Sequence, residues 1–507
     1  MTARPETSIY DRFAATAAVR GDRPALVTDA ETLSWNDLLA RVDALAGRLA
    51  RADVVPGEPV AMLLGNEPGF VVAWLALARL GAVSVPVNPA LVGESLRVVL
   101  ADCRAERILS TPEHAERLGA DLTLGGALTL LDVTATTVVG AGTPPAPHRC
   151  APGTTAAILY TSGTTGRPKG VVLSHRSYLA AGERMVAAIG ITPDDRILVC
   201  LPLFHANPQF YALMSALTAG AGLALVPRFS ASDFWAAAQR LGATGFTYVG
   251  TVLSILQRTA APARHGLRFC TGGGAPTATW AVIEDRFGIA VHELYGMTET
   301  GGFATITAAG AARRGTCGRP RPDMEVAILD EDDVPAPTGA AGEIALRPRA
   351  PGVLFDGYLG LPEATLERCA NLWFHTGDVG MLDDDGYLTF LGRDEHVIRR
   401  GGEHIAPAQV EGVLLRHHAV REAAVVGVPH PVLGEEVEAV VVPEDGVRVD
   451  AWDVRAHLAR DLPASAVPRY YLLVDHLPKT PTEKVRVEAL RGLEGTLVDT
   501  GARRDTS

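Results

Sequence analysis

The stretch Tyr160-Thr161-Ser162-Gly163-Thr164-Thr165-Gly166-Arg167-Pro168-Lys169-Gly170 lies between two short apolar segments, residues 156–159 and 171–173. This pattern predicts a strand, a polar loop and a second strand. The backbone N–H groups, hydroxyls and positive charge of such a loop suit a polyanion, most obviously a nucleotide triphosphate. A flexible surface turn is the alternative, since glycine, proline and threonine are ordinary turn residues. The stretch is not a Walker A loop, because Pro168 precedes the lysine and a strand follows.

The composition bounds the class of protein. The chain has 507 residues, which is enough for two or more domains, and its 47% hydrophobic and 21% charged residues are those of an ordinary globular protein. A net charge of −12 argues against nucleic acid or an anionic membrane as the main partner. Six widely spaced cysteines without a C-x-x-C pair predict reduced thiols and a cytoplasmic protein. We see no signal peptide and no uninterrupted apolar run long enough to span a membrane.

The chain divides by pattern. Helical and strand patterns alternate up to about residue 320, which predicts an α/β domain of parallel sheets with flanking helices. Short segments punctuated by Asp, Gly and Pro then predict a small antiparallel sheet or β-barrel, and a fresh α+β unit follows Gly392-Arg393. The predicted boundaries are a large domain at 1–392 with a β-barrel subdomain at 320–392, a hinge at 393–395, a small C-terminal domain at 396–495 and a frayed tail at 496–507.

Four further polar clusters interrupt the apolar pattern. Thr271–Pro276 contains three glycines after a strand, which leaves room for a flat ring but also fits a simple turn. In 293–300, Glu299 stands beside hydroxyls and suits Mg²⁺, although Thr-Glu-Thr also commonly starts a helix. Asp378, placed in a turn, could accept two ribose hydroxyls or merely cap that turn. Lys484 lies on a proline-stiffened loop where a lone lysine would ordinarily be solvated.

In this order and spacing the motifs resemble the adenylate-forming superfamily, which includes acyl-CoA synthetases, luciferases and the adenylation domains of peptide synthetases. The resemblance covers about residues 10–490. Residues 371–374 and the pair Glu483-Lys484 look like its crotonobetaine/carnitine–CoA ligase-like branch. The resemblance to the superfamily implies an ATP-dependent acid–CoA ligase. Such an enzyme adenylates a carboxylic acid with release of pyrophosphate and then forms the CoA thioester. ATP, Mg²⁺ and CoA are the implied cofactors. A carrier-protein thiol, an amine or a small inorganic nucleophile is the alternative acceptor.

The resemblance also implies roles for individual residues. The catalytic set comprises Lys484, Glu299, Thr298 and His205, of which Glu299 binds Mg²⁺ and Lys484 approaches the carboxylate and the α-phosphate. His205 is expected at the mouth of the acyl pocket, as a gate rather than a general base. The expected ATP- and AMP-binding residues are Thr161, Ser162, Gly163, Thr164, Thr165, Lys169, Gly273, Gly274, Ala275, Pro276, Glu293, Tyr295, Gly296, Asp378 and Arg393.

The acyl pocket and the path for CoA follow by the same resemblance. The expected pocket wall consists of Phe204, Ala206, Asn207, Gln209, Phe210, Gly250, Thr251, Gly272, Gly296 and Met297. Its small residues could admit a ring or a branched chain, and Asn207 and Gln209 either contact a polar substrate group or satisfy backbone. The small domain is expected to rotate at a hinge containing Glu395, so that Arg400, Gly401 and Gly402 line a channel for the thiol.

The sequence departs from the family pattern at two positions. Glu395 stands where many relatives carry Asp, and Glu483 stands where many carry Gly, which could alter how the lysine loop bends. The expected partner is a small carboxylic acid, with no nucleic acid and no membrane span, and a homodimer is left open. A non-catalytic nucleotide-binding relative is the remaining alternative, and the presence of the five expected charged site residues argues against it: Lys169, Glu299, Asp378, Arg393 and Lys484.

Overall fold

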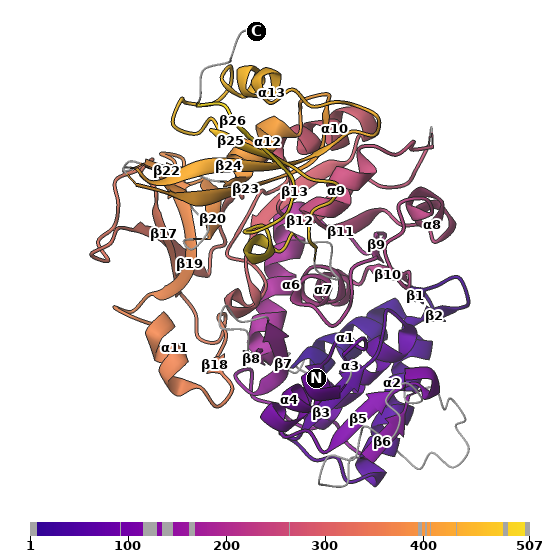
Figure 1. Ribbon diagram of the computed structural model, residues 1–507. Coiled ribbons are helices and arrows are strands. Elements are labelled where there is room, and N and C mark those ends of the chain that lie inside the picture. The colour runs from indigo at the N-terminus through magenta and orange to yellow at the C-terminus, as the bar shows by residue number, and fades with distance from the viewer. Residues whose placement is uncertain are drawn as a thin grey trace.

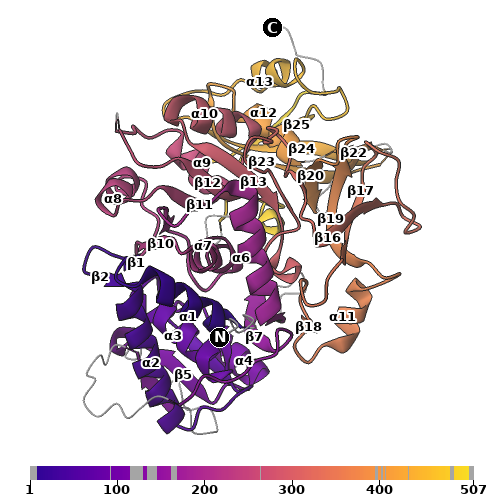
Figure 2. The ribbon, with the colours of Figure 1, turned by 180° about the vertical axis from the view of Figure 1, so that it is seen from behind.

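Two unequal domains make up the chain (Figure 1). The computed structural model describes residues 8–91, 93–114, 129–133, 145–161, 168–262, 264–393, 398–400, 403–405, 407–431, 433–479 and 485–501. Seen from behind, the long helix α6 (His175–Ile189) crosses the middle of the large domain between its two main sheets (Figure 2). None of the helices in these ranges is long and apolar enough to cross a membrane.

The large domain contains two mixed sheets. The seven-stranded sheet has the order β18-β8-β7-β4-β3-β5-β6, and the nine-stranded sheet has the order β15-β14-β13-β12-β11-β9-β10-β1-β2. Their strands are β1 (Pro24–Val27), β2 (Thr32–Ser34), β3 (Pro59–Leu63), β4 (Val83–Pro86), β5 (Arg107–Ser110), β6 (Thr129–Asp132), β7 (Thr155–Thr161), β8 (Lys169–Ser174), β9 (Arg196–Val199), β10 (Gly222–Leu225), β11 (Gly245–Val249), β12 (Phe269–Gly273), β13 (Ala290–Tyr295), β14 (Thr305–Ile306), β15 (Arg319–Pro320) and β18 (Gly357–Tyr358).

The predicted parallel pairing is confirmed in the centre of both sheets, and antiparallel strands extend both sheets at their ends. Strands β3 to β6 pair in parallel, and so do β9 to β13. The hairpin β7–β8 and strands β2, β14, β15 and β18 pair antiparallel. One of these reversals agrees with the predicted strand–loop–strand pattern, since Thr161 at the end of β7 pairs with Lys169 at the start of β8.

Helices cover the sheets and begin where the sequence supplies caps. Ser34 and Asp37 form a reciprocal capping box at the start of α2, and Gly81 ends α3 in the left-handed conformation. The large-domain helices are α1 (Ile9–Arg20), α2 (Trp35–Arg51), α3 (Pro68–Leu80), α4 (Gly93–Cys103), α6, the π-helix η2 (Pro208–Leu213), α7 (Met214–Ala219), α8 (Phe234–Arg240), α9 (Gly250–Leu256), α10 (Thr277–Phe287), the short 3₁₀ helix η3 (Thr298–Thr300) and α11 (Pro362–Arg368).

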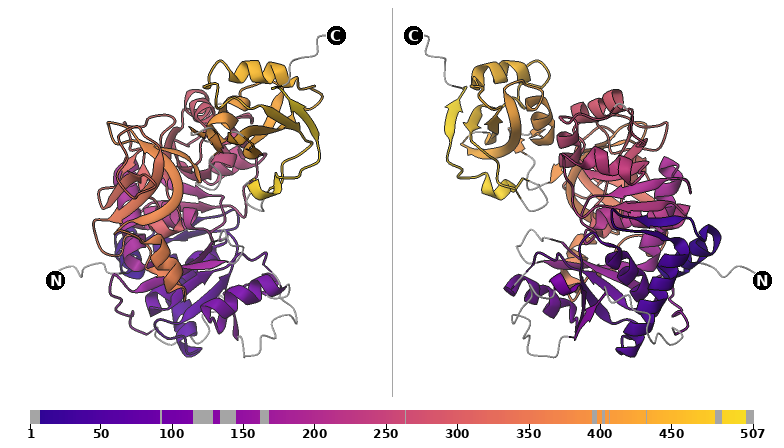
Figure 3. Two further views of the ribbon diagram at one scale, coloured as in Figure 1. Left: turned by 60° about the vertical axis from the view of Figure 1, so that its left-hand side comes forward. Right: turned by 90° about the vertical axis from the view of Figure 1, so that its right-hand side faces the viewer.

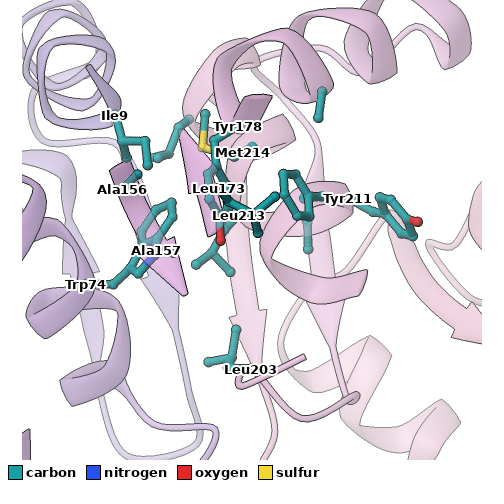
Figure 4. Packing of buried hydrophobic residues seen from close by; sticks show 14 of the residues in the cluster. Ile9, Trp74, Ala156, Ala157, Leu173, Tyr178, Leu203, Tyr211, Leu213 and Met214 are labelled. Atoms are coloured by element: carbon teal, nitrogen blue, oxygen red, sulfur yellow. The ribbon is translucent and has the colours of Figure 1, made fainter. Parts of the chain in front are cut away.

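An aromatic core joins the helices α3, α6 and η2. The Tyr178 ring lies edge-on to Trp74, with 5.5 Å between ring centroids, and stacks on Phe210 at 4.3 Å. Figure 4 shows Trp74 and Tyr178 near Ala156, Ala157 and Leu173 of strands β7 and β8. Since burying each large aromatic side chain removes on the order of 150–250 Å² from water, this cluster is a major source of stability for the domain. The same buried cluster contains residues of both main sheets, so it packs the two sheets together.

The third sheet of the large domain is open, so the predicted β-barrel is wrong. Strands β16 (Met324–Leu329), β17 (Gly342–Pro348), β19 (Phe374–Leu382) and β20 (Leu388–Arg393) pair antiparallel in that order. The pairings among the described residues leave β16 and β20 as edges. Barrels filled by their own side chains typically need about eight strands, and four short strands cannot close around a core.

The small domain is a six-stranded sheet with two helices, and Figure 3 shows it standing against the upper part of the large domain. Its elements are β21 (Ile398–Arg400), β22 (Glu403–Ile405), α12 (Pro407–Leu414), β23 (Val420–His430), β24 (Gly434–Pro443), α13 (Ala451–Leu458), β25 (Tyr470–Leu473), η4 (Val487–Ala489) and β26 (Thr496–Asp499).

The predicted frayed tail is wrong for its first residues. Thr496–Asp499 pairs antiparallel with β25, and Arg469 binds both oxygens of the Asp499 carboxylate at 2.9 Å. Alternating residues in the short segment Thr-Leu-Val-Asp place Val498 against the core, which explains why a polar-looking terminus still forms a strand. The small domain therefore extends beyond the predicted boundary at 495.

Candidate functional site

Four neighbouring parallel strands, β9, β11, β12 and β13, end at one edge of the nine-stranded sheet. The segments that follow them carry the predicted acyl-pocket and nucleotide residues, namely 200–210, 250–251, 274–276 and 296–299. The carboxyl ends of parallel strands are the usual place for ligands in open α/β sheets. The topology therefore brings together motifs that are far apart in sequence.

Glu293 organises the glycine loop after β12. Its carboxylate accepts the N–H of Gly274 at 2.5 Å and the N–H of Ala275 at 3.2 Å, and it also accepts the hydroxyl of Tyr248. The side chain is buried, and this burial raises the pKa of Glu293 to about 8, against the lowering effect of the three hydrogen bonds. The Glu293 side chain thus fixes the glycine loop by hydrogen bonds to its backbone and is itself buried.

Three glycines of the predicted site are required by close backbone approach. A Cβ on Gly250 would lie 1.9 Å from the carbonyl oxygen of Gly274, one on Gly272 would lie 2.0 Å from that of Tyr248, and one on Gly296 would lie 2.5 Å from that of Gly302. These contacts are with backbone, which cannot turn aside as a side chain can. A packing requirement therefore accounts for glycine at these three positions, and their place in the wall of an acyl pocket stays a prediction.

Glu299 and Lys169 meet through Tyr358. Glu299 is buried in η3, and its Oε1 accepts the Tyr358 hydroxyl at 2.8 Å. Lys169 Nζ lies 5.2 Å from the centroid of the Tyr358 ring, because β8 pairs with β18. Thr161 pairs with Lys169 across the β7–β8 hairpin. The loop residues Ser162, Gly163, Thr164 and Thr165 lie outside the described residues.

This arrangement fits one magnesium ion held mainly by substrate. Among the described residues there is no cluster of three or more His, Cys, Asp or Glu side chains that could hold a metal by itself. Mg²⁺ is commonly held by one or two carboxylates together with phosphate oxygens and water. Glu299, with Thr298 beside it, supplies a carboxylate of this kind next to a lysine, so the residues present fit the ion.

Asp378 lies in a strand, so its predicted placement in a turn is wrong. It belongs to β19 and pairs with Arg393 of β20, while Gly377 before it has a φ of 72° and provides the local bend. Asp378 Oδ2 accepts the Tyr295 hydroxyl at 2.7 Å, and Arg393 Nε lies 3.8 Å from Oδ1. Burial raises the pKa of Asp378, while Tyr295 and Arg393 act in the opposite direction.

In the segment that follows β9, some predicted pocket residues are partly exposed and others are buried in the core. Phe204 and His205 pack ring to ring at a centroid distance of 4.5 Å, and His205 is exposed. Asn207 Nδ2 donates to the carbonyl oxygen of Tyr248 at 2.9 Å. Phe204, Ala206, Asn207, Thr251 and Met297 are all partly exposed. These five positions remain available as a pocket wall.

Gln209 and Phe210 do not belong to such a wall. Gln209 is fully buried, donates to the carbonyl oxygen of Leu203 at 2.8 Å and accepts the Tyr178 hydroxyl at 2.7 Å. Phe210 is equally buried in its stack on Tyr178. Gln209 therefore satisfies groups inside the protein, which corrects its assignment to the substrate pocket. The sequence could not separate these two uses of an amide.

In the small domain, Arg400 binds Glu436 through both guanidinium arms, at 2.5 and 3.1 Å. Burial alone would raise the pKa of Glu436, but Arg400 outweighs it and the pKa is lowered. Gly401 and Gly402 of the predicted thiol channel, Glu395 of the hinge, and both Glu483 and Lys484 lie outside the described residues. A cavity of about 560 Å³ lies between β23, β24, β25 and residues 490–497, and it includes none of the predicted site residues.

Two tyrosines of the site escaped sequence reasoning. Tyr248 reaches Glu293 across 45 residues of sequence, and Tyr358 reaches Glu299 across 59. Each lies in a short strand and contributes to its apolar pattern, so no local motif marks either of them. A search for hydroxyl-bearing aromatic residues at strand ends is the one signal that could have suggested them.

Comparison with known proteins agrees with this geometry. The family described as AMP-binding enzyme matches residues 13–359, and the AMP-binding enzyme C-terminal domain matches residues 409–484. The chain therefore belongs to the AMP-binding enzymes.

Curated relatives match over nearly the full length. The chain is 34% identical to a sulfoacetate–CoA ligase of Cupriavidus necator, covering 96% of this chain and 98% of the relative. It is 33% identical to an oxalate–CoA ligase of Arabidopsis thaliana, covering 92% and 94%, and 36% identical to a feruloyl-CoA synthase of an Amycolatopsis species, covering 89% and 92%.

Solved structures agree as well. ATP-bound MatB from Rhodopseudomonas palustris superposes with a TM-score of 0.85 at 29% identity, covering 95% of this chain and 98% of that one. The o-succinylbenzoate CoA synthetase MenE from Bacillus subtilis, in complex with its acyl-adenylate, superposes with a TM-score of 0.83 at 28% identity, covering 96% and 98%. The chain is an AMP-forming acid–CoA ligase with the α/β fold of adenylate-forming enzymes.

Proposed function

We propose that the carboxyl-end edge of β9 to β13 is the adenylation site, with the residue roles expected from the sequence. One observation carries this proposal: the stretch from Glu293 to Glu299 contacts all three predicted parts of a nucleotide site. Glu293 holds the glycine loop, Tyr295 holds Asp378, and Glu299 holds Tyr358 beside Lys169. A single strand and its following turn thereby set the distances between base, ribose and phosphate positions.

Within this site the chain binds and orients ATP. The loop 161–169 and Lys169 contact the β- and γ-phosphates, residues 273–276 and 293–296 enclose adenine, and Asp378 with Arg393 binds ribose. Glu299 with Thr298 would hold a Mg²⁺ ion, which would supply positive charge at the phosphates. Lys484 brings a positive charge to the carboxylate and the α-phosphate, where two anions must approach each other. His205 guards the entrance for the acid.

The second half-reaction needs the small domain in another orientation. We propose that it turns about the hinge at 393–395, which withdraws Lys484 and presents Arg400, Gly401 and Gly402 to the CoA thiol. The thiol sulfur then attacks the acyl carbon, the carbonyl carbon–phosphate oxygen bond breaks, and AMP leaves. The ion pair between Arg400 and Glu436 keeps this strand rigid within the small domain.

We propose a monocarboxylic acid with an uncharged body as the substrate. The partly exposed wall positions, Phe204, Ala206, Asn207, Thr251 and Met297, carry no charge. A second anionic group held among them would be costly without a partner, since burying an unpaired charge is strongly unfavourable. The branch suggested by residues 371–374 receives no particular support, because a crotonobetaine/carnitine–CoA ligase of Citrobacter koseri is 29% identical, below the three relatives described above.

The identity of the acceptor has one specific competitor. A relative of Streptomyces coeruleorubidus, 31% identical over 92% of this chain, is named a fatty acid–[acyl-carrier-protein] ligase. An acyl-carrier protein would use the same thiol chemistry as CoA. We favour CoA because CoA ligases predominate among the relatives compared above.

The test is acid-dependent pyrophosphate release by the wild type and by Lys484→Ala, using a panel of short, branched, aromatic and dicarboxylic acids with and without CoA. We expect release with at least one uncharged-body acid, stimulation by CoA, and a loss of roughly 100-fold or more in the variant, as is typical when a charge-stabilising group is removed. Unchanged release by Lys484→Ala would contradict the proposed role of this lysine. Preference for a dicarboxylic acid would contradict the proposed substrate class.

The cytoplasm as location and a homodimer as assembly remain predictions from the sequence. Cell fractionation would test the first, and light scattering of the purified protein would test the second.

A further inference from the structure

Arg258 joins the large domain to the small domain. It follows helix α9, which begins at Gly250 beside the glycine loop. Its Nη1 lies 3.2 Å from Glu444 Oε1, and its Nη2 donates to the backbone carbonyl of Arg421 at 2.9 Å. Arg421 belongs to β23 and Glu444 follows β24, so both partners are in the small domain.

The strand that Arg258 contacts also holds the base of the segment that carries Lys484. Glu422, the residue after Arg421, forms an ion pair with Lys479 at 2.6 Å. Lys479 and Val485 form an antiparallel bridge and so flank residues 480–484 on both sides. A guanidinium nitrogen of Arg421 reaches the carbonyl of Asp475 at 3.4 Å in the segment leading there. Arg258 therefore contacts the part of the small domain from which the lysine segment departs.

The contact is built to be reversible. Arg258 and Glu444 have 46% and 36% of their side-chain surface exposed. Ion pairs with this exposure contribute about 0.2–1 kcal/mol, which is too little to trap a domain yet enough to shift a balance between two orientations. Helix α9 spans only about two turns and Arg258 follows its last residue, Leu256, by two positions, so one short helix separates the contact from the glycine that packs against the nucleotide loop.

We propose that Arg258 is a positioning residue for the adenylation half-reaction. It holds the small domain in the orientation in which β23, beside the base of the Lys484 segment, contacts the large domain, and it releases Glu444 and Arg421 before thioester formation. The inference rests on the proposed role of Lys484 in adenylation. It assigns to Arg258 an effect on one half-reaction and not on the other.

The experiment separates the two half-reactions in the full-length protein. Adenylation is followed as acid-dependent exchange of labelled pyrophosphate into ATP, with ferulate, isobutyrate and acetate as probe acids and the fastest of them used throughout. Thioester formation is followed from the synthetic adenylate of the same acid and CoA. We expect Arg258→Ala and Glu444→Gln to lower exchange about two- to fivefold, the ratio that corresponds to 0.5–1 kcal/mol, and to leave thioester formation unchanged or faster.

Two further comparisons exclude a merely structural effect. Arg240 forms exposed ion pairs with Asp29 and Asp233 within the large domain, so Arg240→Ala should leave both half-reactions unchanged. The double variant that swaps the two charges, Arg258→Glu with Glu444→Arg, should show faster pyrophosphate exchange than either single charge reversal. Equal loss in both half-reactions for Arg258→Ala, or no loss of exchange, would overturn the proposal.

The same assays separate this inference from the proposed function. If Lys484→Ala exchanges pyrophosphate like the wild type, the role of Lys484 fails and the inference loses its basis. If Lys484→Ala is inactive while Arg258→Ala exchanges normally, only the inference fails.

Discussion

The nucleotide-facing part of the large domain and its contact with the small domain are held by opposite means. In the first, three buried carboxylates each accept a tyrosine hydroxyl: Glu293 from Tyr248, Glu299 from Tyr358 and Asp378 from Tyr295. In the second, Arg258 and Glu444 meet in solvent. Buried hydrogen-bonded groups are costly to disturb, whereas exposed ion pairs break readily. The molecule thus fixes the groups that we propose hold ATP and leaves the domain contact free to change.

Among the substitutions that test this difference between the two regions, we expect the largest effect from Glu299→Gln. Replacing Glu299 with glutamine keeps the shape and an acceptor for Tyr358 but removes the charge available to Mg²⁺. We expect acid-dependent pyrophosphate release to fall by roughly 100-fold or more, with an unchanged melting temperature, and additional Mg²⁺ to recover only part of it. Pyrophosphate assays across a magnesium titration measure this. Full activity of Glu299→Gln would show that the carboxylate does not serve the metal.

We expect a smaller effect, on stability, from a substitution in the closely packed nucleotide-facing part of the large domain. In Gly250→Ala the new Cβ would overlap the carbonyl oxygen of Gly274, at 1.9 Å in the present backbone, so the loop or the helix must shift. We expect the free energy of unfolding to fall by about 1–3 kcal/mol, measured by urea denaturation, together with weaker ATP binding. Gly153→Ala is the matched control, because nothing lies within 4 Å of its added Cβ. Equal stability of both variants would contradict the close approach.

The buried carboxyl of Glu293 predicts a dependence on pH. Its pKa is raised from 4.5 to about 8, so the protonated form is favoured in the folded state. The stabilisation from this group is complete below pH 4.5 and is lost as the pH rises through about 8. Relative to Glu293→Gln, the wild type should lose unfolding free energy over this range, with a slope of up to about 1.4 kcal/mol per pH unit.

Chemical denaturation of both proteins at about pH 5 and about pH 8 measures the difference. A wild type that gains stability relative to the variant with rising pH would show that the three hydrogen bonds dominate over burial. Its carboxylate would then be charged at neutral pH.

The sequence carried the order of motifs but not the contacts between them. The hairpin around residues 161–169, the alternation of helices and strands and the new unit after Arg393 are local patterns, and each appears in the fold. Tyr248 and Tyr358 could not be found, because their partners are distant in sequence and set by strand order. Gln209 was misassigned because an amide that bridges a buried tyrosine and a carbonyl looks, in sequence, like one that faces a substrate.

The sequence left a sheet and a barrel open as alternatives for residues 320–392, and it missed the strand at 496–499, for another reason. Whether a short segment pairs as a strand depends on which sheet edges the rest of the fold leaves available. The composition of the segment does not indicate this.

The central claim is tested most directly by identifying the products formed from ATP, CoA and the acid panel by mass spectrometry. We predict that at least one acid yields its CoA thioester together with AMP and pyrophosphate in equal amounts, and that no thioester forms without ATP. ATP turnover that is indifferent to CoA and gives no acyl-CoA with any acid would contradict the assignment as an acid–CoA ligase, and formation of ADP and phosphate in place of AMP and pyrophosphate would contradict adenylation.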